Sequence, residues 1–259
     1  MNDFLARMET SSRTRLAAAE GIASVESVRR QAEMVPTTGL PSGFLLFAEI
    51  KPTSPAEGAL ATSGFRDLVR AYESGGAAAI SVLTEPTEFG GSIGLIEEIV
   101  ESVSLPVMRK DFIVDPYQVW EARAHGASGA LAIARMLDAE MLEALAAAAV
   151  EADMFLLVEA FDESDIDAIS ALDLSSGHLL VGVNSRDLTT LQVRPHAHEA
   201  LAPLLPENCV AIAESGINTP EQVLAVTGAG YHGVLVGTSL MRSPDPAAAV
   251  ASLVQAGVS

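Results

Sequence analysis

The sequence predicts a single α/β domain, a (β/α)8 barrel of the TIM type with an N-terminal helical extension. Eight short apolar segments of strand type alternate with segments of helical periodicity over about 215 residues, and there is no glycine-rich first turn. Strict alternation of strands and helices makes the strands parallel. A doubly wound sheet, the main alternative, typically has about five or six strands and a glycine-rich turn after the first. The number of units therefore favours a closed barrel.

The expected strands are short runs rich in aliphatic residues, each followed by a turn and a helical pattern. They lie at residues 45–50, 78–83, 106–109, 129–133, 154–158, 178–183, 209–213 and 232–236. Successive strands start roughly 23 to 33 residues apart, which is the length of a βα unit. Between them, acidic residues or proline begin amphipathic stretches such as 138–152 and 220–227, as is typical of helices.

The residues before the first strand, 1–44, form the expected extension. They are helical in pieces and end in a turn-rich segment that contains Pro36, Gly39, Pro41 and Gly43. The barrel is expected to span residues 45–259 as the catalytic domain. We expect the extension and the barrel to form one structural domain.

Composition narrows the class of protein. The formal net charge is −19 at pH 7, which argues against nucleic acid and anionic membranes as partners because both would be repelled. The single cysteine, Cys209, cannot form an internal disulfide, and no cysteine and histidine residues have zinc-ligand spacing. No apolar run approaches the ~20 residues that span a bilayer, and the N-terminus is unlike a signal peptide. We expect a cytoplasmic protein without a structural metal.

Polar residues gather where the predicted strands end, which is where barrel enzymes carry their catalytic groups. They are Glu49 and Lys51, Arg109 and Lys110, Glu159, Asn184 and Arg186, and Glu214 and Ser215. The two lysines, against thirteen arginines, are the only ones in the chain. Taken alone, each residue is more simply explained as a solvated loop residue or half of a surface ion pair. Together, carboxylates and ammonium groups around one opening would shift each other's pKa values and supply separate acids and bases.

The first strand indicates where these groups point. Glu49 and Lys51 are two residues apart, so both side chains leave the same face, and the apolar run 44–50 before them makes that face the expected barrel interior. A carboxylate there can hold an ammonium group. The five histidines lie in predicted helices, in loops before strands or at strand starts, which argues against nucleophilic catalysis by a Ser-His-Asp or Cys-His arrangement. General acid–base chemistry on a carbonyl or enamine is the implied class.

Two segments predict an anion site. Residues 214–220 and 237–239 place glycines and hydroxyl groups just before expected helix starts, where backbone N–H groups are free. The loops after the seventh and eighth strands are the usual phosphate site of this fold. The structural alternative is that these serine and threonine residues are ordinary helix N-caps.

Several of these segments resemble the motifs of the indole-3-glycerol phosphate synthase family. Glu49-Ile50-Lys51 with Ser54-Pro55 resembles the family's first-strand motif, and Arg109-Lys110-Asp111-Phe112 resembles the family's third conserved segment. The resemblance covers about residues 45–245 and includes segments 81–92, 158–159, 182–188, 213–217 and 235–241. It implies a carboxy-lyase that closes the indole ring of 1-(2-carboxyphenylamino)-1-deoxyribulose 5-phosphate, with loss of carbon dioxide and water, in tryptophan biosynthesis. It implies that the enzyme needs no cofactor and no metal. The expected partner is a phosphorylated small-molecule substrate, and the expected oligomeric state is a monomer or a weak homo-oligomer.

The resemblance also implies residue roles. Lys110 would be the general acid that protonates the substrate carbonyl, and Glu159 would act as acid or base in the dehydration. Lys51 would contact charged groups of the substrate. Glu49 and Asn184 would orient the lysines and the substrate hydroxyls, and Glu214 and the substrate-binding Arg186 would complete the polar network. The phosphate ligands would be Ser54, Ser215, Gly216, Gly237 and Thr238, and the wall around the aromatic ring would be Phe89, Phe112 and Leu188. A lysine suits the role of proton donor because a crowded cationic site can lower its pKa, whereas an arginine stays charged.

The sequence departs from the family pattern in three places. Pro52 stands where another basic residue is common, Arg135 stands where an apolar residue is usual, and the N-terminal extension does not match clearly. These departures leave open a paralogue of specialised metabolism that acts on a related phosphorylated substrate, or a non-catalytic barrel that binds a phosphorylated ligand. Phosphoribosylanthranilate isomerase, another phosphate-binding barrel, would need a cysteine where Glu49 and Lys51 stand.

Overall fold

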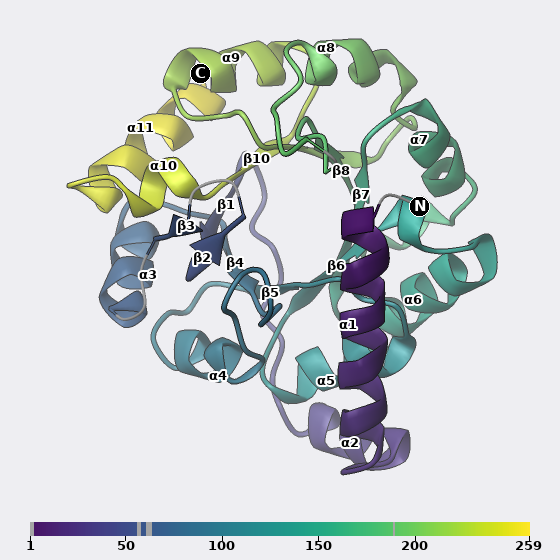
Figure 1. Cartoon of the computed structure of the whole chain (residues 1–259). Coiled ribbons are helices and arrows are strands. Elements are labelled where there is room, and N and C mark those ends of the chain that lie inside the picture. The colour runs from purple at the N-terminus through teal and green to yellow at the C-terminus, as the bar shows by residue number, and fades with distance from the viewer. Residues whose placement is uncertain (1–2, 56–57, 61–63, 189) are drawn as a thin grey trace.

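The computed structural model describes residues 3–55, 58–60, 64–188 and 190–259. A closed parallel barrel with the strand order β1-β10-β9-β8-β7-β6-β5-β4 lies inside a ring of helices (Figure 1). The barrel strands are β1 (Leu45–Ile50), β4 (Ala79–Leu83), β5 (Val107–Lys110), β6 (Gly129–Ile133), β7 (Phe155–Ala160), β8 (Leu179–Asn184), β9 (Val210–Glu214) and β10 (Gly233–Val236). A short antiparallel ribbon of β2 (Thr53–Ser54) and β3 (Gly58–Ala59) follows β1.

The α-helices alternate with the strands, as predicted. They are α1 (Asp3–Glu20), α2 (Val25–Glu33), α3 (Phe65–Ser74), α4 (Gly94–Val100), α5 (Pro116–Ala124), α6 (Ala139–Glu151), α7 (Glu163–Ser170), α8 (Ala197–Leu201), α9 (Pro220–Gly228), α10 (Thr238–Met241) and α11 (Pro246–Gly257). Asp138 caps α6, and Thr219 and Gln222 form a capping box at α9, whose first residue is Pro220. The helix starts that the sequence marks with an acidic residue or a proline are therefore present.

Every predicted strand is present, and its bounds differ from the prediction by at most two residues. Six of the strands begin one residue later than expected, and four of these, β5, β7, β8 and β9, also extend one or two residues beyond the expected carboxyl end, because the hydrogen-bonded ladder continues through polar residues. The register pairs Leu83 with Lys110, Ile133 with Glu159 and Asn184 with Glu214. These charged and amide side chains therefore stand on the strands themselves, where the sheet fixes their positions, and not in the loops that follow.

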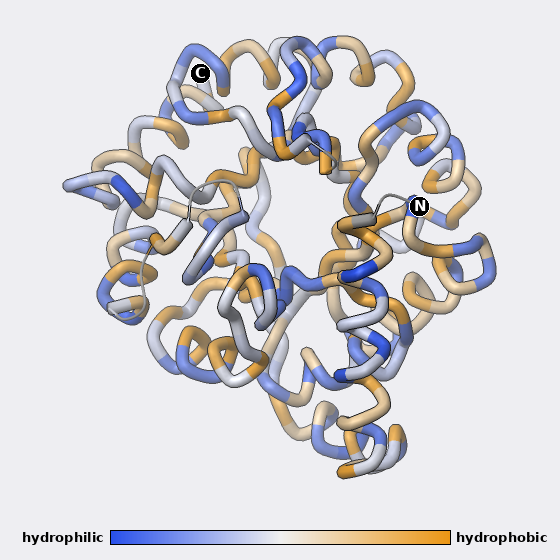
Figure 2. The backbone as a smooth tube through the Cα atoms, viewed as in Figure 1, coloured by the Kyte–Doolittle hydropathy of each residue, from blue (hydrophilic) through white to orange (hydrophobic). Residues whose placement is uncertain are grey.

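Side chains alternate between the inside and the outside of the barrel. On β1, Leu45 and Phe47 face an apolar interior, and Leu46, Ala48 and Ile50 pack with the surrounding helices. Inside the barrel, the rings of Phe47 and Phe155 meet edge to face with centroids 5.9 Å apart. Hydrophobic and hydrophilic segments alternate along the helices of the ring (Figure 2), as expected for helices with one buried face.

The N-terminal helices attach to the barrel near its opening. In Figure 1, α1 crosses the front of the ring and leads down to α2, which packs on α5. Arg15 of α1 makes two hydrogen bonds of 2.7 and 2.8 Å to Asp111 after β5, and Gln118 of α5 donates to Ser12 at 2.9 Å. None of the helices within the described ranges is long and apolar enough to cross a membrane.

Candidate active site

A cavity of about 540 Å³ lies at the carboxyl ends of the barrel strands. All the site residues predicted from the sequence line it, namely Glu49, Lys51, Ser54, Phe89, Lys110, Phe112, Glu159, Asn184, Arg186, Leu188, Glu214, Ser215, Gly216, Gly237 and Thr238. They come from seven of the eight barrel strands or from the loops after them. The barrel therefore brings residues that are scattered along the sequence to one pocket.

The two lysines of the chain share a network of carboxylates. Lys110 Nζ lies 2.9 Å from Glu214 Oε2 and 4.0 Å from Glu49 Oε2. Lys51 Nζ lies 2.7 Å from Glu49 Oε1, so the carboxylate of Glu49 stands between both ammonium groups. On the same side of the pocket, Asn184 Nδ2 donates a hydrogen bond to Glu159 Oε1. The alternation argument for Glu49 and Lys51 is thus confirmed.

Electrostatics in this network differ from the expectation for Lys110. Burial disfavours its charged form, but the carboxylates of Glu214, Glu159 and Glu49 outweigh burial and raise the pKa of Lys110 above its ordinary value. The expectation that a crowded cationic site lowers the pKa of Lys110 was therefore wrong. Lys110 is a fully protonated donor in the free protein, placed among carboxylates.

The two carboxylates nearest to Lys110 are held in opposite ways. Burial raises the pKa of Glu214 to about 7, although the Lys110 ammonium group acts in the other direction. Burial also disfavours the ionised form of Glu49, but Lys51 and Lys110 together hold its pKa below the ordinary value. One buried carboxylate thus gains a proton near neutral pH and its neighbour stays ionised, which is how separate acid and base roles arise in one pocket.

Two glycines make room for these carboxylates inside the barrel. A Cβ atom at Gly182 of β8 would overlap Glu214 Oε1, and a Cβ atom at Gly237 after β10 would overlap Glu49 Oε1. Any larger residue would have to displace the acid, so each carboxylate needs a glycine there to keep its place. For Gly237 this need is independent of a role in phosphate binding.

The segments predicted to bind an anion form one rim of the cavity, which we call the anion cradle and define by Ser215, Gly216, Gly237 and Thr238. Ser215 and Gly216 have φ values of 63° and 75°, so the chain turns sharply after β9 and exposes successive backbone groups. The short helix α10 begins at Thr238, directly after a glycine that has no side chain to cap it. The helix-cap alternative holds for Thr219, which caps α9, and does not account for the cradle.

The opposite wall is apolar and aromatic. The rings of Phe89 and Phe112 lie 6.2 Å apart at an angle of 36°, and Leu188 lies nearby in the same lining. The loop that carries Phe89 is folded around Glu85, whose carboxylate accepts three hydrogen bonds from successive backbone N–H groups. Phe4 of α1 packs edge to face on Phe112 with centroids 5.9 Å apart and also lines the cavity.

Comparison with known proteins identifies the family. The model of the indole-3-glycerol phosphate synthase family matches residues 6–253. An indole-3-glycerol phosphate synthase of Mycolicibacterium vanbaalenii is 43% identical over 252 residues, which cover 95% of this chain and 91% of the relative. The chain belongs to the indole-3-glycerol phosphate synthase family. The enzyme of the same name from Mycobacterium leprae is 46% identical over 216 residues, which cover 83% of this chain and 78% of the relative.

Comparison with solved structures supports the fold and does not bear on the activity. The 3-hexulose-6-phosphate synthase of Salmonella typhimurium superposes with a TM-score of 0.66 over 82% of this chain and 98% of that chain, at 15% sequence identity. The thiamine phosphate pyrophosphorylase of Pyrococcus furiosus superposes with a TM-score of 0.58 over 82% and 95% of the two chains, at 16% identity. Both likenesses confirm the barrel.

The match corrects one expectation and the structure explains two others. Because the family model begins at residue 6, the N-terminal extension is part of the family pattern, and the expectation that it does not match was wrong. Arg135 is accommodated by Asp165, to which its Nε donates at 2.9 Å, and its guanidinium lies 4.5 Å from the ring centroid of Phe161. Pro52 is buried, and its carbonyl accepts a hydrogen bond of 2.9 Å from Leu60 N.

Sequence reasoning missed some residues of the site and placed the end of β5 one residue too early. Arg109 points out of the barrel, where its guanidinium bonds Asp111, Glu121 and Thr84, because Lys110 takes the inward position. Several other lining residues were not predicted, among them Phe4 and Arg242. Arg242 follows the cradle by one helical turn, a spacing that is visible in the sequence; nothing in the sequence shows that α1 reaches the pocket.

Proposed function

We propose that this chain is an indole-3-glycerol phosphate synthase that acts on 1-(2-carboxyphenylamino)-1-deoxyribulose 5-phosphate. The observation that carries the proposal is the position of Lys110, a protonated donor held by Glu214 and Glu49 in a pocket with an anion cradle on one rim and aromatic residues on the other. A substrate with a phosphate at one end and an aromatic ring at the other has the same two-ended character. Family membership makes this reaction the expected one.

In the first step, the ring carbon that bears the carboxylate attacks the ketone carbon of the sugar chain. As this carbon–carbon bond forms, Lys110 gives a proton to the ketone oxygen, which becomes a hydroxyl group. The bond to the carboxylate then breaks, carbon dioxide leaves, and the electron pair restores the aromatic ring. A positioned ammonium group also stabilises the negative charge that develops on the oxygen.

In the second step, the new hydroxyl group leaves as water with a proton from the neighbouring carbon, which completes the indole. We infer that Glu159 serves this dehydration as acid or base, with Asn184 fixing the orientation of its carboxylate. Lys51 binds the charged groups of the substrate. Neither step requires a redox change, so neither requires a redox cofactor.

The rest of the pocket binds the two ends of the substrate. The anion cradle, with Ser54 and Arg186 beside it, holds the phosphate, and backbone N–H groups supply much of the binding because the whole chain is strongly acidic. Phe89, Phe112 and Leu188 hold the aromatic ring. We also infer that the extension 1–44 and the barrel 45–259 act as one structural domain, in a cytoplasmic monomer or weak homo-oligomer.

The experiment supplies the carboxyphenylamino deoxyribulose phosphate and follows the fluorescence of the indole product. The wild type should turn over, whereas Lys110→Ala and Glu159→Gln should each lose at least ~10² in kcat, the usual contribution of a positioned acid or base. Arg13→Ala is the matched control, because Arg13 is exposed on α1 and, among the residues that the structure describes, forms its ion pair with Glu9 one turn away. If the wild type binds this substrate without forming indole, the proposal is wrong and the chain is a non-catalytic barrel. Turnover of only a related phosphorylated substrate would assign the chain to a specialised pathway.

A further inference from the structure

The loop between β8 and α8 folds back against its own strand. Arg186 and Val193 form an antiparallel bridge, Asp187 N donates to Gln192 O at 2.8 Å, and Arg194 N donates to Ser185 O at 2.8 Å. Neighbouring side chains of an extended segment point to opposite sides. Val193 lines the cavity, so Arg194 points away from it, toward the ends of β7 and β8.

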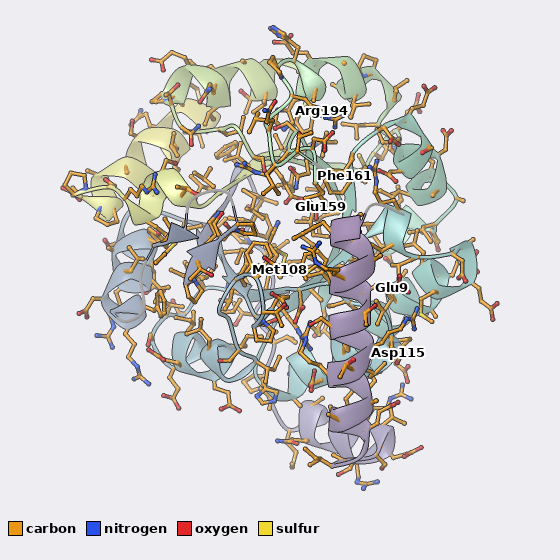
Figure 3. All side chains as sticks on the ribbon, in the orientation of Figure 1. Glu9, Met108, Asp115, Glu159, Phe161 and Arg194 are labelled. Atoms are coloured by element: carbon orange, nitrogen blue, oxygen red, sulfur yellow. The ribbon has the colours of Figure 1, made fainter. Side chains whose placement is uncertain are left out.

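The guanidinium of Arg194 joins the backbones of these two strands. Its Nη2 donates to the carbonyl oxygen of Phe161, just after β7, and lies 3.4 Å from the carbonyl oxygen of Asn184, the last residue of β8. Figure 3 shows Glu159, Phe161 and Arg194 following one another outward from the barrel centre. Arg194 is thus a cross-link from the folded-back loop to both strand ends.

The two strand ends carry the pair assigned to dehydration. Glu159 precedes Phe161 by two residues, and Asn184 supplies both the carbonyl that faces Arg194 and the amide that donates to Glu159. The other side of Phe161 is already fixed, because its N–H donates to Asp165 at 2.7 Å and Arg135 covers its ring. Without Arg194, the ends of β7 and β8 would be joined by the strand ladder below them and by the hydrogen bond from Asn184 to Glu159 itself.

We propose that Arg194 is a positioning residue that holds the carboxylate of Glu159 and the amide of Asn184 in the geometry needed for the dehydration step. This inference rests on the proposed function. Both contacts are made by one nitrogen, Nη2, whose N–H groups are held in the plane of the guanidinium, whereas a lysine ammonium group has a less directional geometry. Arg194 is not among the residues that line the cavity.

The test compares Arg194→Met and Arg194→Lys with the wild type, with Arg13→Met as a control on the exposed face of α1. Arg194→Met should lower kcat about 10-fold and change KM less than about twofold, because misplacement of a catalytic group by less than an ångström affects the chemical step more than binding. Arg194→Lys should recover part of the loss. Thermal unfolding of each variant identifies any that fails to fold, and Arg194→Gln then replaces Arg194→Met.

A double-mutant cycle separates positioning from a general loss of stability. In the Glu159→Gln background, Arg194→Met should lower the remaining kcat less than about twofold, since residues that act as a unit are not additive. Equal factors in both backgrounds would overturn the inference, as would an unchanged kcat in a folded Arg194→Met variant of an active enzyme. If the wild type itself does not turn over, the proposed function fails. That outcome is distinct from a failure of the inference on Arg194, which requires an active wild type.

Discussion

Lys110 Nζ lies 2.9 Å from Glu214 Oε2, although the two residues are 104 positions apart in the sequence. Both side chains face the barrel interior, from β5 and from β9. Burial raises the pKa of Glu214 to about 7, and among the described residues no hydrogen-bond partner reaches its Oε1. This pair therefore changes its total charge near neutral pH.

The first prediction is an acidic limb in the pH dependence of kcat/KM. As pH falls through about 7, Glu214 takes up a proton, the ion pair that orients Lys110 weakens, and the rate should fall. The apparent pKa belongs to the coupled pair and not to one residue. Glu214→Gln should be slower than the wild type and lack this limb, keeping only the titration of the substrate phosphate near about 6. The same limb near 7 in both proteins would contradict the assignment.

The second prediction concerns the kind of cation at position 110. Lys110→Arg keeps the positive charge but places a group there that does not release a proton in proteins. We expect kcat to fall by at least ~10², as in Lys110→Ala, with KM closer to that of the wild type. Steady-state kinetics of both variants measure the difference. If Lys110→Arg retained more than about a tenth of the activity, electrostatic stabilisation and not proton donation would be the role of this residue.

The third prediction tests the room made for Glu214. Gly182→Ala adds a Cβ atom that would overlap Glu214 Oε1, so the carboxylate must move away from Lys110. We expect kcat to fall by at least about tenfold with the barrel still folded. Gly228→Ala is the matched control, because an added Cβ would meet nothing within 4 Å and alanine has a higher helix propensity than glycine at a helical position such as this one in α9. A Gly182→Ala enzyme with wild-type kcat would show that the contact of Glu214 with Lys110 is dispensable.

Strand positions and the polar strand ends were predictable because they depend on short-range patterns. The apolar run that leads into Glu49 and Lys51 fixes their side, and the register of parallel strands then brings them to Lys110 and Glu214. The direction of the Lys110 pKa shift was not predictable, since it depends on how many carboxylates surround the ammonium group. Nor was the inward choice between Arg109 and Lys110, which a one-residue shift of the strand would reverse.

Contacts of the N-terminal extension were also beyond the sequence. Phe4 reaches the cavity because α1 lies across the barrel end, where Arg15 binds Asp111, 96 residues away in the sequence. No local pattern in α1 identifies Asp111 as its partner. The role of Arg194 is similar, because the loop must fold back before its side chain can reach two strands.

The last prediction concerns the buried carboxylate that receives α1. Burial disfavours ionised Asp111, but Arg109 and Arg15 outweigh it and lower its pKa to about 2. Because the folded pKa lies below the ordinary value of 3.8, Asp111 contributes stability above that value, and the contribution is lost as pH falls through 2. The difference corresponds to about 2 kcal/mol at neutral pH, of which about 1 kcal/mol should be lost by pH 3.

Chemical unfolding of the wild type and Asp111→Asn between pH 6 and 3 measures this contribution. The stability advantage of the wild type should narrow by about 1 kcal/mol over that range, because the asparagine does not titrate and all other carboxylates are shared. Arg15→Met should shift the loss to higher pH, since one of the two cations that lower the pKa is removed. An advantage that stays constant down to pH 3 would mean that the two arginines do not hold this charge, and α1 would then owe its position to apolar contacts such as that of Phe4 with Phe112.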